Sequence, residues 1–506
     1  MARGLSRVFA RGVGGGAGGV TRMVIGVFAA VSMQSPITTA RADDLGAAPV
    51  SLDTRLAPAV LITGIPGLTS EAPTLRERTA QANVPGLSIA VVTDGEIAWA
   101  EGFGFADDAG QAVVTERTLF QAASISKPVA AAGAMRLVEM GEMELDGDIE
   151  EHLVSWRIPA SSADVSWDRT ASPVTLRQLL GHNAGMTVRG FPGYGSFDEV
   201  PSAIGVLDGL GNTAPVVVEA VPGSRHQYSG GGYTVAQVAM VDASAEHDDF
   251  PSLMSALVFE PLGMVHSTFE QPLPEELCGR AASGHTSDGT RLEGGWVVHP
   301  EMAAAGLWTT PSDLALFFAS LQRGMAGVDG PVLSAGSVGE MLRFEGDVRY
   351  GLGLNIGTER IGHGGGNRGF RCVATFFNEG GDGVVIMSNW DNGWALNSDV
   401  LRTIFTNLDW PGLRAVEKTV VELSERELGL CAGAYEIPGY GTFVVEVDEQ
   451  RIGLNVTLPD GQRFRILPES PTEFFDLEDG VPIVFHITGN EPATGASWSE
   501  ATASRK

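Results

Sequence analysis

The amino-acid sequence predicts an α+β fold, in which an antiparallel sheet is flanked by helices and joined to a helical region, followed by a small C-terminal β-domain. Three observations lead to this class: a hairpin pattern near the start, a loop-rich helical stretch in the middle, and runs of period two at the end. The chain has 506 residues, with 43% hydrophobic and 19% charged. These values are typical of globular proteins, and the length allows more than one domain.

Strand-like runs at residues 87–92 and 96–103 predict the hairpin. They are joined at Asp94-Gly95, a pair typical of tight antiparallel turns. Strand-like runs return late in the chain, and we expect them to share one sheet with the hairpin. These later runs cover residues 351–356, 372–377 and 383–389.

Helical patterns occupy the segments around and between these strands. Residues 74–83 read as an amphipathic helix ended by Pro85, and residues 127–141 as a helix that stops at Gly141. A further helix is expected after the last strand, at residues 395–408. Short helical segments separated by Gly and Pro predict an inserted helical region, with members at residues 176–181, 234–243 and 252–259.

The hydrophobic pattern of the sequence changes after Trp410-Pro411-Gly412, which marks a predicted domain boundary. Beyond it, period-two runs at residues 443–447, 452–458 and 464–467 indicate a small β-domain. We therefore predict one domain over residues 43–412 and a second, barrel-like one over residues 419–506.

The first 42 residues resemble a secretory signal peptide. They carry five arginines and no acidic residue, and an apolar run covers residues 23–33. This run is shorter than the roughly 20 residues that a spanning helix needs. Ala40-Arg41-Ala42 supplies small residues for cleavage, so we expect a mature start at Asp43, a periplasmic or secreted location, and no membrane insertion after the leader is removed.

The chain is strongly acidic, with 33 Lys+Arg against 62 Asp+Glu and a formal net charge of −29. Without the five leader arginines, 28 basic residues face 62 acidic ones, which gives −34. This charge argues against nucleic-acid partners and anionic membrane surfaces. The three cysteines are isolated, so they cannot build a disulfide framework or a metal cage, although one pair could form. We expect no cofactor and no metal.

Lysine is scarce in this sequence, which uses arginine elsewhere. The three lysines are Lys127, Lys418 and Lys506, and the first lies in Ser124-Ile125-Ser126-Lys127. Arginine stays charged in proteins, whereas a desolvated lysine can lose its proton. On one helical turn, Ser124 and Lys127 would lie side by side, so a neutral amine could take the serine proton. The N-terminus of that helix also offers free N–H groups to a developing oxyanion.

Two glycine-rich stretches follow this motif in order. They are Tyr228-Ser229-Gly230-Gly231-Gly232-Tyr233 and His363-Gly364-Gly365-Gly366-Asn367-Arg368-Gly369-Phe370. Together with the Ser-x-x-Lys motif they resemble the serine β-lactamase and penicillin-binding superfamily, in particular the class C β-lactamase-like group with its D-Ala-D-Ala carboxypeptidases, D-aminopeptidases and esterases. The resemblance covers about residues 75 to 410, and it implies a β-lactamase-like fold. Further matching stretches lie at residues 175–186, 260–264 and 305–314.

The resemblance implies roles for four side chains. Ser124 would be the nucleophile and Lys127 its base. Tyr228, which matches the tyrosine of the family's Tyr-x-Asn motif, would relay a proton between Lys127 and the leaving group. His363 stands first in the family's Lys-Thr-Gly or His-x-Gly strand motif, where it would hydrogen-bond near Tyr228 and tune the site electrostatically. We assign His182 instead to structure, holding neighbouring backbone.

The glycines that follow His363 are implied to bind substrate through their backbone. Gly364 and Gly365 would leave the strand edge open, and the N–H groups of Ser124 and Gly366 would form the oxyanion hole.

Two positions depart from the family pattern. Gly230 stands where asparagine often contacts the acyl amide of a β-lactam or peptide. Gly364 stands where threonine would help to bind a substrate carboxylate. These losses disfavour strong β-lactamase activity, unless Arg368 supplies a replacement contact.

We therefore predict an exported, metal-free serine hydrolase that cleaves a small-molecule ester or amide (peptide) bond through an acyl-enzyme. The alternative within the same family is a true β-lactamase or D-Ala-D-Ala carboxypeptidase acting on cell-wall peptides or β-lactams. A third hypothesis, a non-catalytic binding protein on an inherited scaffold, is disfavoured by the intact Ser124, Lys127 and Tyr228. The sequence leaves the oligomeric state open.

Overall fold

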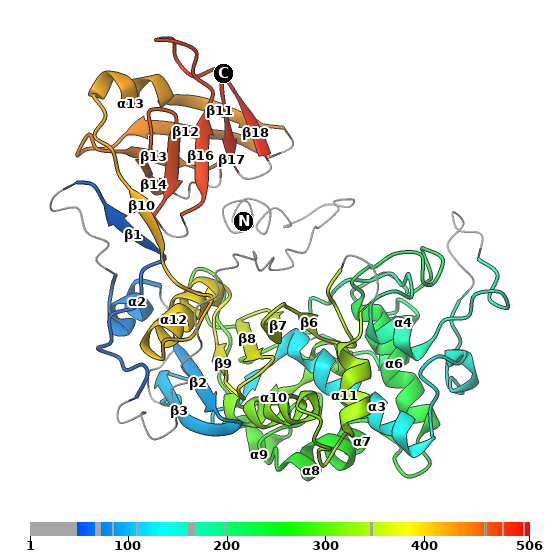
Figure 1. The fold of residues 1–506 in the computed structure, drawn as a ribbon. Coiled ribbons are helices and arrows are strands. Elements are labelled where there is room, and N and C mark those ends of the chain that lie inside the picture. Colours follow the sequence, from blue (N-terminus) through cyan, green and yellow to red (C-terminus); the bar gives the residue numbers. More distant parts are fainter. Residues whose placement is uncertain are drawn as a thin grey trace. The chain divides into compact units, whose positions relative to one another are not determined.

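The computed structural model forms two compact units (Figure 1). The larger comprises the described residues of Leu75–Leu401 with the few described residues before Thr54, and the smaller those of Thr54–Thr74 and Arg402–Lys506. The predicted leader, residues 1–42, lies outside the described residues. The structure describes residues 48–65, 72–82, 85–107, 110, 112–159, 167–195, 198–344, 348–438, 440–459, 461, 463–477, 480–498 and 501–506.

A six-stranded antiparallel sheet forms the centre of the larger unit, in the order β3-β2-β9-β8-β7-β6. β2 pairs with β3 on one side and with β9 on the other, so the early hairpin and the late strands share one sheet, as predicted. The adjacent strands β2 and β9 are buried along their whole length, which suits their apolar sequences. The strands are β2 (Gly86–Thr93), β3 (Glu96–Gly104), β6 (Asn355–Ile356), β7 (Arg360–Asn367), β8 (Phe370–Phe377) and β9 (Gly383–Ser388).

The turn between β2 and β3 has the predicted chemistry. Asp94 and Gly95 have φ values of +51° and +80°, as a two-residue hairpin turn of the primed type requires. The strand predicted over residues 351–356 was too long, because only its last two residues pair with β7. Gly353 turns the backbone there with φ +81°, and a Cβ on it would lie 2.8 Å from the Cα of Pro128.

Helices cover both faces of this sheet (Figure 1). α10 (Pro311–Met325) packs on one face, where the ring of Phe318 stacks on that of Phe376 in β8 at a centroid distance of 4.8 Å. α12 (Gly393–Asn407) lies on the other face, where the Asn397 amide donates to the carbonyl of Arg371. α2 (Leu75–Ala82), α3 (Ser126–Met140) and α12 match the three longer predicted helices closely.

The helical region between strands β3 and β6 is present as predicted, in short pieces. Side-chain caps begin several of these helices; for example, the hydroxyl of Ser229 accepts a hydrogen bond from the N–H of Gly232 at the start of α6. A two-stranded pair, β4 (Phe120–Gln121) and β5 (Trp308–Thr309), joins this region to the entry of α3. The main pieces are η2 (Ala123–Ile125), α4 (Leu176–Leu180), α5 (Ala203–Leu207), α6 (Gly230–Ala243), α7 (Phe250–Met254), η4 (Ser255–Phe259), η5 (Met302–Gly306) and α11 (Ala335–Leu342).

The smaller unit contains the closed antiparallel barrel that the C-terminal pattern predicted. Aromatic side chains fill its interior, and the hydroxyl of Tyr435 donates to the carbonyl of Cys431 at the end of α13 (Glu425–Cys431). The barrel strands are β11 (Gly433–Ile437), β12 (Gly441–Val447), β13 (Leu454–Thr457), β14 (Arg463–Pro468), β15 (Glu473–Asp476), β16 (Pro482–Phe485), β17 (Gly495–Trp498) and β18 (Ala501–Arg505).

One early segment belongs to this smaller unit. β1 (Val60–Thr63) pairs in parallel with β10 (Val416–Thr419). The division into compact units therefore differs from the predicted ranges 43–412 and 419–506, because residues near position 60 hydrogen-bond with residues more than 350 positions later.

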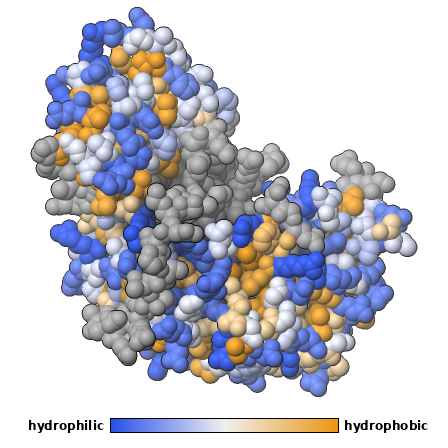
Figure 2. Space-filling model, in the orientation of Figure 1, coloured by the Kyte–Doolittle hydropathy of each residue, from blue (hydrophilic) through white to orange (hydrophobic). Residues whose placement is uncertain are grey.

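Hydrophilic residues cover most of the visible surface of each unit, and apolar residues form smaller groups among the hydrophilic ones (Figure 2). None of the helices in the described ranges is both long and apolar enough to cross a bilayer. All three cysteines are free thiols, and Cys372 and Cys431 are buried.

Candidate active site

Ser124 and Lys127 lie together where the chain enters α3. Ser124 belongs to the 3₁₀ turn η2, which runs directly into the helix, so the two residues are one turn apart. The Nζ atom of Lys127 lies 3.2 Å from the Oγ atom of Ser124. The half-buried serine is within reach of solvent, whereas the lysine is buried. This arrangement is the one that the Ser-x-x-Lys spacing predicted.

The surroundings of Lys127 favour a neutral amine. The side chain is only 2% exposed, and no carboxylate forms an ion pair with it among the residues that the structure describes. Burial lowers the pKa of Lys127 to about 7. Its amine donates to the carbonyl of Ala304 in η5, at 2.7 Å. The carbonyl fixes one N–H of the amine and so helps to direct the nitrogen toward Ser124.

Two tyrosine rings lie against the same amine. The Nζ atom is 4.9 Å from the ring centroid of Tyr228 and 5.6 Å from that of Tyr233. The hydroxyl of Tyr228 is buried and forms no hydrogen bond of regular geometry with a described residue. Burial raises its pKa above the usual value, while the neighbouring Ser124 side chain opposes that shift. Tyr228 is therefore a neutral phenol beside the serine and the lysine.

His363 lies on β7, and both of its ring nitrogens are engaged. Nδ1 is 2.6 Å from the carbonyl oxygen of Gly364, which can only accept, so Nδ1 carries the proton. Nε2 then accepts from the hydroxyl of Tyr350, at 3.2 Å. Burial, followed by the charge of Lys127, lowers the pKa of His363 to about 3. The histidine is neutral and accepts from Tyr350 and not from Tyr228, whose ring centroid lies 6.5 Å from that of His363.

Tyr350 was not singled out by its local sequence. It is buried, and its ring lies 4.9 Å from that of His182 and 6.0 Å from that of His363. The chain has only six tyrosines, and three of them, Tyr228, Tyr233 and Tyr350, meet around this site. The scarcity of tyrosine in the sequence is the feature that could have indicated Tyr350 as a site residue.

His182 supports the site in the structural role predicted for it. Its Nδ1 accepts a hydrogen bond from the backbone N–H of Ser229, at 3.1 Å. Its ring lies 4.1 Å from that of Tyr228, and burial lowers its pKa well below the usual value. The neutral imidazole thus holds the turn that carries Tyr228.

The glycine-rich part of β7 presents backbone groups at a sheet edge. β6 pairs only with Ile361 and Gly362, so none of the described strands pairs with the following residues on that side. A two-residue turn closes the β7–β8 hairpin at Asn367 and Phe370, and hydrogen-bonded pairs alternate from there. Gly366 is then in a pair whose N–H and C=O point away from β8. This is the direction that an oxyanion donor at Gly366 requires.

A close approach explains the glycine between these positions. A Cβ on Gly365 would lie 2.1 Å from the carbonyl oxygen of Ala122, immediately before η2. Only glycine lets β7 come this near to the turn that carries Ser124. Gly365 therefore sets the distance between the strand edge and the serine.

Asn367 and Ser126, neither of which was assigned a role from the sequence, connect segments of the site through hydrogen bonds. The amide of Asn367 donates to Oε1 of Gln121 at 2.9 Å and to the carbonyl of Ala305 at 3.0 Å. The hydroxyl of Ser126 accepts from the N–H of Leu307 and donates to the carbonyl of Ala123. These bonds connect β7, η5 and the entry of α3, three segments far apart in the sequence.

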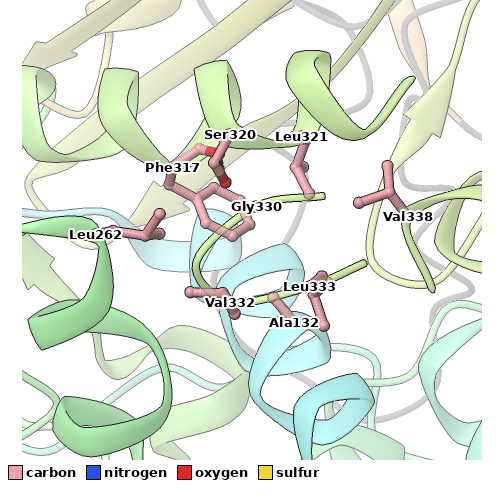
Figure 3. Close-up of a pocket in the computed structure, with 9 residues that line it drawn as sticks. All are labelled: Ala132, Leu262, Phe317, Ser320, Leu321, Gly330, Val332, Leu333 and Val338. Atoms are coloured by element: carbon pink, nitrogen blue, oxygen red, sulfur yellow. Dashed lines mark hydrogen bonds between the residues drawn. The ribbon is translucent and has the colours of Figure 1, made fainter. Parts of the chain in front are cut away.

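A small pocket elsewhere in the larger unit does not belong to this site (Figure 3). It lies between α3 and α10, has a volume of about 10 Å³ and is lined mainly by apolar side chains such as Phe317 and Leu333. A space of this size holds about one water molecule. None of its lining residues was predicted to act on a substrate.

The fold and the site together define a β-lactamase-like protein: an antiparallel sheet with helices on both faces, and a Ser-x-x-Lys pair at the entry of a buried helix. The family model described as Beta-lactamase matches residues 72–403, well over half of the chain. The chain therefore belongs to the β-lactamase family, whose members are serine hydrolases.

Curated relatives carry different activities in their names. Esterase EstB of Burkholderia gladioli is 29% identical over 249 residues, which cover 47% of this chain and 59% of EstB. Unguisins hydrolase ungD of Aspergillus violaceofuscus is 30% identical over 239 residues, covering 44% of this chain and 39% of that protein. The chain thus spans less than two thirds of the length of these relatives.

Solved structures share the fold. The octameric penicillin-binding protein homologue from Pyrococcus abyssi aligns over 85% of this chain and 98% of its own, with a TM-score of 0.58 and 21% identity. FmtA from Staphylococcus aureus aligns over 69% and 91%, with a TM-score of 0.52 and 15% identity. At these identities the likeness concerns the fold alone.

Proposed function

We propose that this protein is an exported serine hydrolase that cleaves an ester or amide bond through an acyl-enzyme on Ser124. The observation that carries the proposal is the 3.2 Å contact between Ser124 and a buried Lys127 whose pKa is about 7. At neutral pH about half of such amines are unprotonated, and an unprotonated amine at this distance can accept the serine proton.

Acylation would proceed as follows. The Oγ atom of Ser124 attacks the substrate carbonyl carbon while its proton passes to Nζ of Lys127. The negative charge on the carbonyl oxygen is held by the N–H groups of Ser124 and Gly366. When the bond to the leaving group breaks, the leaving oxygen or nitrogen takes a proton from the hydroxyl of Tyr228, which recovers one from Lys127. The raised pKa of Tyr228 suits this role, because the phenol stays protonated until the leaving group needs it.

Deacylation would use the same groups with water in place of the serine. A water molecule attacks the acyl carbon and gives a proton to the Lys127–Tyr228 pair. The bond to Ser124 breaks, and its oxygen takes a proton back. His363 stays a neutral imidazole near neutral pH and takes up no additional proton, because its pKa is lowered to about 3. Its role is to hold the Gly364 backbone and Tyr350 in place.

The second candidate function is a β-lactamase or D-Ala-D-Ala carboxypeptidase. The Ser-x-x-Lys pair is compatible with it, and a penicillin-binding protein homologue shares the fold. The glycines at positions 230 and 364 count against it, because they lack side chains that could meet a substrate amide and carboxylate. An unmatched polar contact costs about 1–3 kcal/mol, so two such losses would reduce specificity considerably.

Two experiments test the function. Labelling with a fluorophosphonate, followed by mass spectrometry, should locate the adduct on Ser124, and Ser124→Ala should abolish labelling. Values of kcat/KM on nitrophenyl acetate, a chromogenic cephalosporin and a D-Ala-terminated peptide should rank the ester first. Efficient cephalosporin turnover would favour the second candidate, and an adduct on another serine would refute the first.

Export is tested separately. The protein expressed from its full sequence should appear outside the cytoplasm with an N-terminus at Asp43, as read by mass spectrometry of the mature chain. A chain that keeps residues 1–42 would contradict this part of the proposal.

A further inference from the structure

Aromatic rings occupy the space beside two glycines of the site. Gly230 begins α6, two residues after Tyr228, and a Cβ built on it would lie 2.8 Å from Cε2 of Phe191. Gly364 follows His363, and a Cβ there would lie 3.0 Å from Cη2 of Trp394. At both places the ring fills the volume that a larger residue would need. Each of the two glycine positions, one near Tyr228 and the other next to His363, is therefore adjoined by an aromatic ring.

The indole of Trp394 runs along the glycine-rich strand. Trp394 lies in the first turn of α12 and is 42% exposed, although it packs against β7. Besides its contact with Gly364, its Cζ2 atom would be 3.6 Å from a Cβ on Gly366. Gly366 is the residue whose N–H points away from β8. A substrate held at that N–H would thus have an exposed aromatic wall beside it.

Arg371, a cation near the Trp394 ring, already forms hydrogen bonds and an ion pair within the protein. A Cβ on Gly366 would be 3.5 Å from Cδ of Arg371, but the Arg371 guanidinium donates to the carbonyls of Asn367 and Phe370 at 2.5 and 2.7 Å. Its other terminal nitrogen pairs with Asp391 at 3.1 Å. These partners occupy both terminal nitrogens and neutralise the charge. The Nε–H has no hydrogen-bond partner among the described residues, but it is buried, so the guanidinium offers little to a substrate anion.

Arg368 is the other cation near the turn of this hairpin. It is exposed at the β7–β8 turn, and no hydrogen bond or ion pair joins its side chain to a residue in the described ranges. Its contribution can therefore be tested separately from that of the aromatic wall.

The surface beside Gly230 is formed by the ring of Phe191. Phe191 is half-buried and packs against the main hydrophobic core. Next to it, a Cβ on Gly231 would meet the backbone carbonyl oxygen of Thr187 at 2.7 Å and Cγ2 of Val216 at 2.8 Å. The surface at the start of α6 thus consists of apolar side chains and of carbonyl oxygen, which can only accept and so cannot bond to a substrate carboxylate.

We infer that Phe191 and Trp394 are specificity-determining residues that select uncharged substrates with an apolar group on each side of the bond to be cleaved. The inference rests on the proposed hydrolase function and narrows its substrate class. The physical reason is desolvation, since a carboxylate placed against either ring would lose water without gaining a charged or hydrogen-bonding partner. An alkyl or aryl group in the same place gains contact area.

The test compares matched esters that differ by one carboxylate. On the acyl side these are nitrophenyl butyrate and the nitrophenyl monoester of succinate, and on the leaving-group side phenyl acetate and 3-acetoxybenzoate. The native protein should prefer the uncharged member of each pair by about tenfold or more in kcat/KM. Trp394→Ala and Phe191→Ala should each reduce this preference in one of the two pairs. Phe105→Ala removes a ring that is also 42% exposed, on a segment without predicted site residues, and should leave both preferences unchanged.

Further variants distinguish the effect of the Trp394 ring from an effect on folding and from an effect of the nearby Arg368. Trp394→Phe keeps an apolar ring and should keep the preference, whereas Trp394→Arg adds a cation and should shift it toward the carboxylate. Arg368→Ala should not change the ranking. Equal kcat/KM values within both pairs for the native protein, or unchanged preferences in Trp394→Ala and Phe191→Ala, would overturn the inference. Fluorophosphonate labelling of Ser124 reports on the hydrolase function itself. Failure of the substrate inference can therefore be distinguished from failure of the proposed function.

Discussion

The amine of Lys127 lies 3.2 Å from the hydroxyl of Ser124, and no carboxylate among the described residues pairs with that amine. Most lysines in proteins are exposed and charged. Here burial lowers the pKa to about 7, so the same side chain can act as a base near neutral pH.

Removing either member of the pair should stop turnover. We expect Ser124→Ala and Lys127→Arg each to lower kcat/KM on nitrophenyl acetate by at least about 100-fold, because base catalysis is typically worth 10²–10⁴. Arginine keeps a positive charge but cannot accept the serine proton. Circular dichroism should confirm that both variants fold. More than about a tenth of the native activity in Lys127→Arg would mean that Lys127 is not the base.

The rate should depend on pH through the protonation of Lys127. The base acts only when its amine is neutral, so kcat/KM should rise as the pH increases through about 7 and then level off. His363, with a pKa lowered to about 3, should add no second limb between pH 4 and 8. A pH–rate profile of the native protein checks the midpoint. A rate that falls as the pH rises through 7 would contradict the assignment.

Tyr350 should act as a positioning residue through His363. Tyr350→Phe removes the hydroxyl that donates to Nε2 of His363 and leaves a buried acceptor unpaired. We expect a loss of about 1–3 kcal/mol in the free energy of unfolding and a reduced kcat. Because Lys127 and Ser124 remain in place, the midpoint of the pH–rate profile should stay near 7. A shifted midpoint would indicate that Tyr350 acts on Lys127 directly.

The glycine at position 365 should tolerate no side chain. In Gly365→Ala the new Cβ would lie 2.1 Å from the carbonyl oxygen of Ala122, so β7 must move away from the turn that carries Ser124. We expect kcat/KM to fall at least about tenfold, since small displacements at a reacting centre can cost up to about 100-fold. Gly339→Ala on α11 is the matched control, because a Cβ there meets nothing within 4 Å. Equal activities in the two variants would refute the close-approach argument.

The C-terminal barrel should be dispensable for acylation. Ser124, Lys127, Tyr228 and His363 all belong to the larger unit, so a chain ending at Leu413 should still be labelled by a fluorophosphonate. That cut removes β10 and leaves β1 without its partner strand. A second chain that ends after residue 420 keeps the pair and controls for this loss. If both shortened chains are folded but unlabelled, the barrel supplies something that acylation needs.

Local patterns were sufficient for much of the fold. The Asp94-Gly95 turn, the helix that stops at Gly141 and the period-two runs of the barrel all depend on neighbours in the sequence, and the structure contains each of them. The same holds for the contact between Ser124 and Lys127, because a spacing of three on a helical turn brings the two side chains together wherever the helix packs.

Other features depended on contacts between distant segments. β7 was not predicted from periodicity, because its glycines carry no side chains that could alternate. Residues near position 60 were grouped with the catalytic unit, although β1 forms its hydrogen bonds with β10. Such pairings are decided by which segments meet in three dimensions, and composition alone does not specify them.

By itself, the sequence determined which residues predict the chemistry of this protein: one of its three lysines lies three residues after a serine, and the tyrosine and histidine motifs follow in family order. The tertiary structure alone decided how that chemistry is tuned. Burial under η5 and two tyrosine rings lowers the pKa of Lys127, and the hydroxyl of Tyr350 donates a hydrogen bond to His363. Desolvation and hydrogen-bond geometry arise only when the chain is packed, because they depend on groups that are far apart in the sequence.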